Sequence, residues 1–206
     1  MGIDKMDKKK AKKKKKPLWR RIFKWIFAFI LVSGLVGSAF AAYVILTTPS
    51  INTNNIYDMI HQPSVIYDDK GNELESVSTA QLRENIPIDK MPDNLKNAFI
   101  ATEDKTFYTH HGFNIIRMIG AIKDGALNGG HVSGTSTITQ QLAKNLYLSS
   151  ERSLTRKIRE AYYTVILEKN LTKDQILEAY LNCISFGYNS YGVEAAANSY
   201  FGKDVG

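Results

Sequence analysis

The chain has 206 residues and a formal net charge of +7, and its length fits one domain with appended segments. Residues 1–24 hold 12 of the 27 basic residues and 2 of the 20 acidic ones, which leaves 15 basic and 18 acidic residues in the remainder. The composition therefore excludes a uniformly basic domain of the kind that binds nucleic acid, and the single cysteine, Cys183, excludes an intrachain disulfide.

The first 46 residues are typical of a membrane anchor behind a basic tail. Residues 25–46 form an uncharged run of 22 residues, and a helix of that length spans a bilayer core of roughly 30 Å. Because the basic residues precede this run, we expect residues 1–24 in the cytoplasm and the residues after Thr47 outside the cell membrane. A cleaved signal peptide is the alternative, but its apolar region is usually shorter, at about 7–15 residues.

The segments that follow predict a small β element and then a series of helices. Residues 47–63 are expected to form a linker close to the membrane. In the domain at residues 64–206, a β-type run, an Asp-Lys-Gly-Asn turn and a second run predict a hairpin at residues 64–74. Capping residues and apolar spacing then predict five helices. They start or are capped at Asp93, Asn114, Ile138, Ser153 and Thr172. The expected fold class is mainly α.

Two of these helices carry apolar stripes that we expect to face the core, since residues three or four apart share a helix face. In the second helix the stripe consists of Ile115, Ile119, Ile122 and Ala126. In the fourth helix it consists of Leu154, Ile158, Ala161, Tyr162 and Val165. The polar residues of the fourth helix are then expected on its outer face.

Residues 103–112, Glu-Asp-Lys-Thr-Phe-Tyr-Thr-His-His-Gly, place two adjacent carboxylates before an aromatic residue, a histidine pair and a glycine. Glu103 is expected near the C-terminal end of its helix, where the helix dipole and neighbouring phenylalanines disfavour the charged form of a carboxylate. Such a carboxylate accepts a proton readily near neutral pH, so Glu103 is a candidate general base. Asp104 is expected to be a supporting polar residue in the same cleft. A solvated carboxylate at a helix end is the plainer alternative.

The rest of this segment is expected to be structural. Adjacent histidines rarely bind one metal ion together, and no further ligand follows His110 and His111 at a typical metal-binding spacing. We therefore expect no metal site at this histidine pair. His110 should shape the turn through hydrogen bonds, Phe107 is an aromatic residue of the buried type, and Gly112 should supply backbone freedom.

Three further strings follow, at residues 134–145, 156–160 and 173–182. In the middle string, two cations precede Glu160 by three and four residues, so that all three share a helix face. The cations favour the charged form of Glu160 and make it an organiser of cationic side chains, a poorer proton acceptor than Glu103. An ordinary surface salt bridge is the alternative.

Four such strings in this order, behind an apolar anchor, resemble the peptidoglycan glycosyltransferase module (family 51) of class A penicillin-binding proteins and of their single-module relatives. The resemblance runs from about residue 65 to residue 206. It implies a lysozyme-like helical fold and an inverting glycosyl transfer that polymerises lipid II, with undecaprenyl diphosphate as the leaving group. In that family the position of Glu103 holds the general base, which takes the proton from the acceptor sugar's 4-hydroxyl.

The resemblance also assigns roles to the later strings. A leaving diphosphate gains charge in the transition state, and cations stabilise that charge without any proton transfer. The candidates for this role are Lys144, Arg152, Arg156 and Lys157. Hydrogen bonds to sugar or phosphate oxygens are expected from Ser136, Thr137, Gln140 and Gln141. In the last string, Glu178 and Asn182 are expected to pin the cleft. The family module continues through further helices, so we expect residues 64–206 to cover it incompletely.

Two other function classes stay open at this point. A lysozyme-like glycan hydrolase or lytic enzyme shares an α-rich fold and a catalytic glutamate, but it needs no diphosphate-binding cations. An inactive membrane scaffold for cell-wall assembly is the other. The expected partners are lipid II, the growing glycan strand, the membrane and other cell-wall synthesis and division proteins, without nucleic acid. No cofactor is certain, although a divalent cation such as Mg²⁺ is compatible with a diphosphate substrate.

Overall fold

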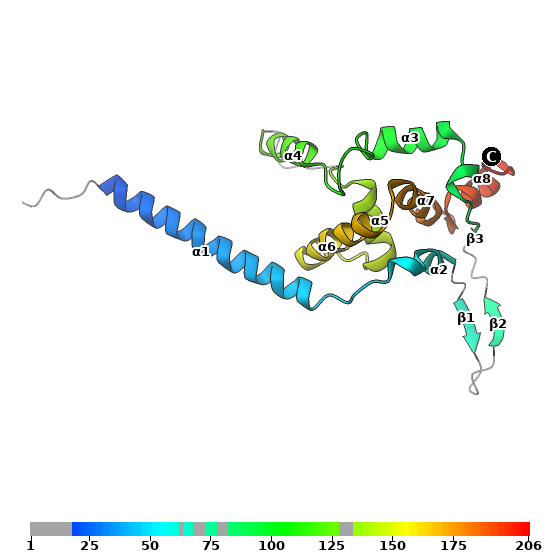
Figure 1. Cartoon of the computed structure of the whole chain (residues 1–206), viewed down its shortest axis with the longest axis horizontal. Coiled ribbons are helices and arrows are strands. Elements are labelled where there is room, and N and C mark those ends of the chain that lie inside the picture. Colours follow the sequence, from blue (N-terminus) through cyan, green and yellow to red (C-terminus); the bar gives the residue numbers. More distant parts are fainter. Residues whose placement is uncertain (1–17, 62–63, 68–72, 78–81, 128–133) are drawn as a thin grey trace, which may run out of the picture. The chain divides into compact units, whose positions relative to one another are not determined.

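In this computed structural model, the structure describes residues 18–61, 64–67, 73–77, 82–127 and 134–206 (Figure 1). Spatial contacts between Cα atoms group the chain into two compact units, Met1–Tyr43 and Val44–Gly206. The described part of the first unit belongs to helix α1 (Leu18–Leu46). Its segment Ile22–Leu46 has a mean hydropathy of 2.2 and is long and apolar enough to cross a membrane. Length and composition therefore support the expected membrane anchor.

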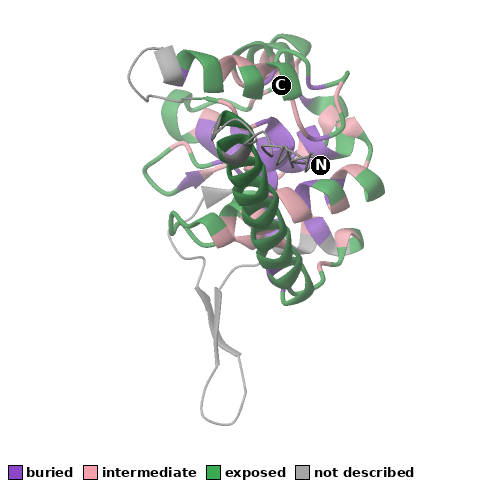
Figure 2. Ribbon diagram, turned by 90° about the vertical axis from the view of Figure 1, so that its left-hand side faces the viewer, coloured by how far each residue is buried: buried purple, intermediate pink, exposed green. Residues whose placement is uncertain are grey.

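The core of the second unit is formed by three helices, α5 (Ile138–Tyr147), α6 (Leu154–Asn170) and α7 (Lys173–Cys183). Buried residues gather inside this unit, whereas α1 is exposed along most of its length (Figure 2). Fully buried aliphatic side chains come from all three helices, and each contributes roughly 1.5–3 kcal/mol by leaving water. They include Ile138, Leu142, Leu167, Ile176, Leu177 and Leu181. The prediction of a mainly α fold is confirmed.

The helices begin close to where the sequence predicts, because local caps fix their first turns. Asn114 accepts a hydrogen bond from the backbone N–H of Arg117 at 2.8 Å, at the start of α4 (Ile115–Leu127). The caps of the three core helices are Thr137, Ser153 and Thr172. In α3 (Asp93–Glu103) the N-cap is Pro92, and no side chain caps the helix. Asp93 lies instead in the first turn, where its carboxylate pairs with Lys96 at 2.8 Å.

The buried face of α6 differs from the predicted one. The buried residues of this helix are Glu160, Tyr163, Thr164 and Leu167, which are spaced three or four apart and form one face. Leu154 and Val165, which belong to the predicted apolar stripe, are exposed. Ile158, Ala161 and Tyr162 of the same stripe are half-buried, and Tyr162 packs against the core. The stripe prediction was therefore wrong at its two ends and missed the buried Glu160, because it assumed that a charged residue would face solvent. Glu160 faces inward, where two cations compensate its charge.

The exposure of α4 also differs from the prediction. Ile115, Ile119 and Ile122 of its predicted inner stripe are all exposed, and Ile116 is 86% exposed. The side chain of Ala126 lies outside the described residues. The spacing of these residues predicted an amphipathic helix correctly, but no described helix covers its apolar face.

Two small β elements complete the second unit. Strands β1 (Ser64–Tyr67) and β2 (Glu73–Val77) pair antiparallel, which confirms the predicted hairpin, while its predicted turn lies outside the described residues. Strands β3 (Leu82–Arg83) and β4 (Ser190–Tyr191) pair in parallel. This second pairing joins the chain before α3 to the chain before helix α8 (Val193–Phe201), and the sequence did not predict it.

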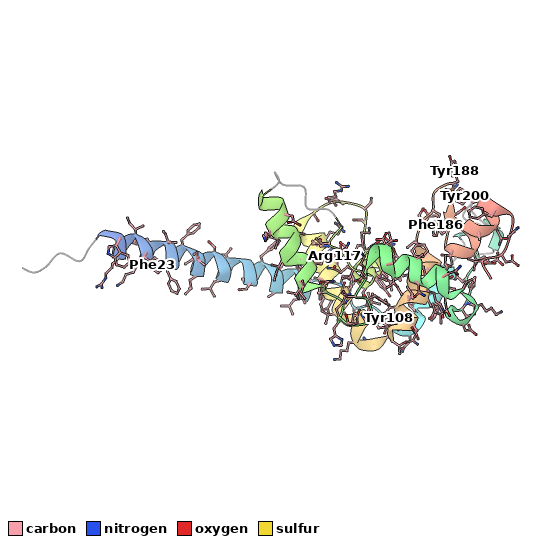
Figure 3. The ribbon with its side chains drawn as sticks, turned by 90° about the horizontal axis from the view of Figure 1, so that it is seen from above. Phe23, Tyr108, Arg117, Phe186, Tyr188 and Tyr200 are labelled. Carbon is pink, nitrogen blue, oxygen red and sulfur yellow. The ribbon has the colours of Figure 1, made fainter. Side chains whose placement is uncertain are left out.

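The remaining short elements lie before α3 and after α7. They are η1 (Thr53–Asn55), α2 (Ile56–His61), η2 (Ile88–Lys90) and α8 (Val193–Phe201). The α2 helix buries Ile56 and Ile60 in the core. Near α8, Tyr188 and Tyr200 lie edge to face with ring centroids 6.3 Å apart (Figure 3). Of these elements, α2, η2 and α8 contact α7, and η1 contacts α2.

Candidate active site

Glu103 is the last residue of α3, and a neutral side chain holds its carboxylate. Gln141 of α5 donates a hydrogen bond from Nε2 to Oε2 of Glu103 at 2.7 Å. In the part of the chain that the structure describes, no hydrogen bond reaches the other carboxylate oxygen, Oε1. Glu103 lines a cavity of about 160 Å³ together with Ala98, Phe99 and Thr102. Oε1 is therefore available to a group bound in that cavity.

Gln141 is held in turn by Tyr180 of α7. The Tyr180 hydroxyl donates to Oε1 of Gln141 at 3.2 Å. Burial, followed by the negative charge of Glu103, raises the pKa of the Tyr180 hydroxyl above its ordinary value. Sequence reasoning assigned Gln141 to substrate. The structure connects its amide to the carboxylate of Glu103 on one side and to Tyr180, a core residue, on the other.

Arg117 of α4 contacts the same helix end (Figure 3). Its NH1 donates to the backbone carbonyl of Glu103 at 2.5 Å. Carbonyl groups at the C-terminal end of a helix carry partial negative charge, so a cation there stabilises the end of α3. Sequence reasoning missed Arg117, because it lies outside the four strings and carries no local pattern.

Asp104 and His110 form a buried pair inside the turn that follows α3. Nε2 of His110 lies 2.8 Å from Oδ2 of Asp104, and the same oxygen accepts from the backbone N–H of Ile138 at 3.2 Å. Nδ1 of His110 accepts from the backbone N–H of Gly112 at 3.1 Å. Because Nδ1 accepts a hydrogen bond, the ring proton lies on Nε2, and Nε2 donates a hydrogen bond to Asp104. Asp104 is completely buried, so it supports the turn and the start of α5 from inside.

Gly112 closes the turn against α6, as expected of a residue with backbone freedom. Its φ is +84°, a conformation that suits glycine. A Cβ atom there would lie 2.7 Å from Cγ2 of Thr164 and 3.0 Å from Cγ of Glu168. Its carbonyl accepts a hydrogen bond from the Thr137 hydroxyl at 2.7 Å. Gly112 is therefore required both by the backbone and by the space around it.

Phe107 packs below this turn as a fully buried side chain. Its ring lies edge to face with the ring of His110, at 6.4 Å between centroids, and Nζ of Lys173 lies 4.6 Å from its centroid. Lys173 also donates to Oε1 of Glu168 at 2.7 Å, an oxygen that Thr139 contacts at 2.5 Å. The turn is thus held from α5, α6 and α7 together.

The structure assigns two predicted substrate contacts to helix capping. Thr137 and Gln140 form a capping box at the start of α5, with the backbone N–H of Thr137 donating to Oε1 of Gln140 at 3.0 Å. Both side chains are buried. This arrangement does not favour direct contact of Thr137 and Gln140 with sugar or phosphate oxygens.

Glu160 forms the second carboxylate centre. Arg156 donates from NH1 to Oε2 of Glu160 at 3.0 Å, and Nζ of Lys157 pairs with Oε1. Glu160 is only 2% exposed, whereas the side chain of Lys157 is 46% exposed. Lys157 also lies 3.4 Å from the hydroxyl oxygen of Ser136, just before α5. One buried carboxylate thus anchors two cations, of which Lys157 faces solvent.

The other two predicted phosphate ligands do not contact Glu160. Lys144 and Arg152 are exposed, and neither forms an ion pair with any residue in the described ranges. Lys144 lies on the same helix as Gln141, and Arg152 precedes α6 by two residues. The structure therefore leaves both cations available to a ligand but does not bring them into contact with Glu160.

Glu178 and Asn182 pin the chain before α3 onto α7. The amide of Asn182 bonds both backbone groups of Ile86, at 3.1 Å to the N–H and 2.9 Å to the carbonyl. Oε2 of Glu178 accepts from the backbone N–H of Ile88 at 2.9 Å. Both residues hold the segment that leads into α3. Their described contacts do not reach the Glu103 cavity.

Among the described residues, no group of three or more His, Cys, Asp or Glu side chains is placed to hold a metal ion.

A model of the family described as Transglycosylase matches residues 70–206 of the chain. The chain belongs to this transglycosylase family. The match begins within the predicted hairpin and includes all four strings.

Curated relatives extend the transglycosylase similarity to nearly the whole chain. Penicillin-binding protein 1A of Clostridium botulinum (strain Langeland / NCTC 10281 / Type F) is 41% identical over 201 residues, which cover 96% of this chain and 24% of the relative. Penicillin-binding protein 1A of Clostridium perfringens (strain 13 / Type A) is 43% identical over 193 residues, covering 90% and 28%. Penicillin-binding protein 1A/1B of Bacillus subtilis (strain 168) is 41% identical over 197 residues, covering 95% and 21%. The chain spans about a quarter of the length of these relatives.

The transglycosylase module thus contains two carboxylates whose oxygens have different partners. The Glu103 carboxylate accepts a hydrogen bond from a neutral amide, while the Glu160 carboxylate is paired with two cations. A neutral donor orients a carboxylate without adding the positive charge that would weaken it as a base, whereas cations favour the charged form. The resemblance to the class A penicillin-binding protein module is confirmed, and the geometry fits two separate chemical roles.

Proposed function

We propose that this chain is a membrane-anchored peptidoglycan glycosyltransferase that polymerises lipid II into glycan strands. The reaction is an inverting transfer in which undecaprenyl diphosphate leaves the anomeric carbon of the donor. The single observation that carries the proposal is the contrast between Glu103, held by the neutral Gln141, and Glu160, held by two cations. Transfer from a diphosphate donor needs both a base and a cationic site.

Glu103 acts as the general base in this proposal. The acceptor's 4-hydroxyl lies against Oε1, the oxygen that lacks a hydrogen bond among the described residues, and gives up its proton as its oxygen attacks the anomeric carbon. A new C–O bond forms there while the bond to the diphosphate breaks, and the bonding electrons leave with the diphosphate. A positioned base of this kind contributes about 10²–10⁴-fold to the rate.

The Glu160 cluster supplies the charge that the leaving group requires. Glu160 fixes the positions of Arg156 and Lys157, and Lys157 presents its ammonium group to solvent beside Ser136. A preorganised cation of this kind stabilises the negative charge that develops on the diphosphate. Lys144 and Arg152, which are exposed, add to this site when the substrate binds.

A lysozyme-like hydrolase is the runner-up, because a glutamate base alone also suits glycan cleavage. The cations around Glu160 favour transfer from a diphosphate, because hydrolysis of a glycan releases no diphosphate. Incubation of the full-length protein with lipid II separates the two. Long glycan strands and free undecaprenyl diphosphate support the proposal. Shortened fragments from preformed glycan, without polymer from lipid II, would contradict it.

We also propose that residues 1–24 are cytoplasmic, that residues 25–46 span the membrane and that residues 64–206 act outside it, after a linker at residues 47–63. The apolar length of α1 and the basic residues before it support this topology. Protease added to intact cells should digest the outer domain and spare the tail. A mature N-terminus found near residue 42 would instead show cleavage and contradict the anchor.

A further inference from the structure

The side chain of Gln141 lies between a candidate base and a buried tyrosine. Its amide nitrogen donates to Glu103 at 2.7 Å, and its amide oxygen accepts from Tyr180 at 3.2 Å. The three residues come from α3, α5 and α7 and lie far apart in the sequence. Each end of the amide thus has one partner, and the partners have opposite hydrogen-bonding character.

The hydroxyl of Tyr180 determines which way the Gln141 amide points. Rotated by half a turn, the amide would place its oxygen against the Glu103 carboxylate, and two acceptors would face each other. Tyr180 prevents this rotation because its hydroxyl donates a hydrogen bond to the amide oxygen. Burial and the nearby Glu103 raise the pKa of Tyr180, so this hydroxyl keeps its proton and remains a donor.

Tyr180 is itself rigidly placed. It is 3% exposed and belongs to the buried face of α7. The ring of Phe99 packs against it edge to face, with centroids 6.4 Å apart and an interplanar angle of 80°. Phe99 also lines the cavity of Glu103. The packing of Tyr180 in the helical core therefore fixes its hydroxyl relative to the amide of Gln141.

We propose that Tyr180 is a positioning residue for proton transfer at Glu103, acting through the amide of Gln141. The inference rests on the proposed role of Glu103 as the base. Gln141 fixes the oxygen Oε2 and leaves Oε1 directed at the acceptor hydroxyl, and Tyr180 keeps Gln141 in the orientation that does so. Tyr180 touches neither the substrate nor the reacting atoms.

The test compares two tyrosine variants of the full-length protein. Tyr180→Phe removes only the hydroxyl and should lower the kcat of lipid II polymerisation about fivefold, with KM unchanged, as expected for the loss of one neutral hydrogen bond. Tyr163→Phe is the matched control. Tyr163 is also 3% exposed, and its hydroxyl donates to the carbonyl of Pro49 at 3.0 Å. The control should change stability alone.

A double-mutant cycle then separates positioning from packing. Gln141→Met should lower kcat by itself, and Tyr180→Phe should cause no further loss in that background. Equal losses in both backgrounds would overturn the proposal, as would a normal kcat for Tyr180→Phe with a lowered Tm. If Tyr180→Phe does not fold, a normal kcat for Gln141→Met overturns it alone. Activity retained by Glu103→Gln would instead reject the base on which the inference rests.

Discussion

Replacement of Gly112 by alanine tests whether the turn after α3 is fixed by its contact with α6. The φ of +84° costs an L-residue about 1–2 kcal/mol. The new Cβ would also lie 2.7 Å from Cγ2 of Thr164, and overpacking of this kind costs about 1–3 kcal/mol. We therefore expect Gly112→Ala to destabilise the domain by about 2–5 kcal/mol, which lowers the Tm by roughly 4–20 °C.

Gly202→Ala provides the matched control. Gly202 also has a positive φ, of +61°, but a Cβ atom there meets nothing within 4 Å. The control carries only the backbone cost, which corresponds to a fall in Tm of roughly 2–8 °C. Thr164→Ser removes the methyl group that Cβ would strike and keeps the hydroxyl that donates to the carbonyl of Glu160. It should restore part of the stability that Gly112→Ala loses.

Thermal and chemical unfolding, followed by circular dichroism, measure all of these variants. Equal losses for Gly112→Ala and Gly202→Ala would refute the argument from close packing. A Thr164→Ser change that is merely additive with Gly112→Ala would refute it as well, because the two sites would then be independent.

Three further predictions concern charged or titrating side chains. Lys157→Ala should destabilise the domain by less than about 1 kcal/mol, because the lysine is half exposed. It should nevertheless lower lipid II turnover. Arg156→Ala should destabilise the domain more, by up to about 3 kcal/mol, because the Arg156 side chain is only 18% exposed and its pair with the buried Glu160 is less screened by water. A large fall in Tm at unchanged turnover for Lys157→Ala would favour a plain salt bridge. Burial, followed by Glu178, raises the pKa of Tyr57 from 10.0 to about 12. Stability linked to Tyr57 is therefore complete below pH 10 and is lost as pH rises toward 12, and Tyr57→Phe should flatten that decline in denaturant titrations.

Features set by neighbouring residues could be predicted from the sequence. The caps at Asn114, Ser153 and Thr172 depend on hydrogen bonds that reach only three residues along the chain. The hairpin depends on an adjacent turn. The shared helix face of Arg156 and Glu160 follows from their spacing. In each case one local rule was sufficient.

Features set by tertiary contact could not be predicted in the same way. The inward face of α6 depends on the burial of Glu160, which is possible only because cations compensate its charge. Gln141 of α5 contacts Tyr180 of α7, and the whole of α6 lies between these two helices in the sequence. Thr137 and Gln140 were assigned to substrate because the sequence does not reveal that both side chains are buried.

The most direct test of the central claim is Glu103→Gln in the full-length protein, assayed by polymerisation of lipid II. The change keeps the size of the side chain and an oxygen that can accept from Gln141, but removes the base. A loss of about 10²–10⁴-fold is expected, with the Tm unchanged and with normal activity in the control Glu151→Gln, an exposed glutamate before α6. Turnover of Glu103→Gln close to that of the wild type would contradict the account.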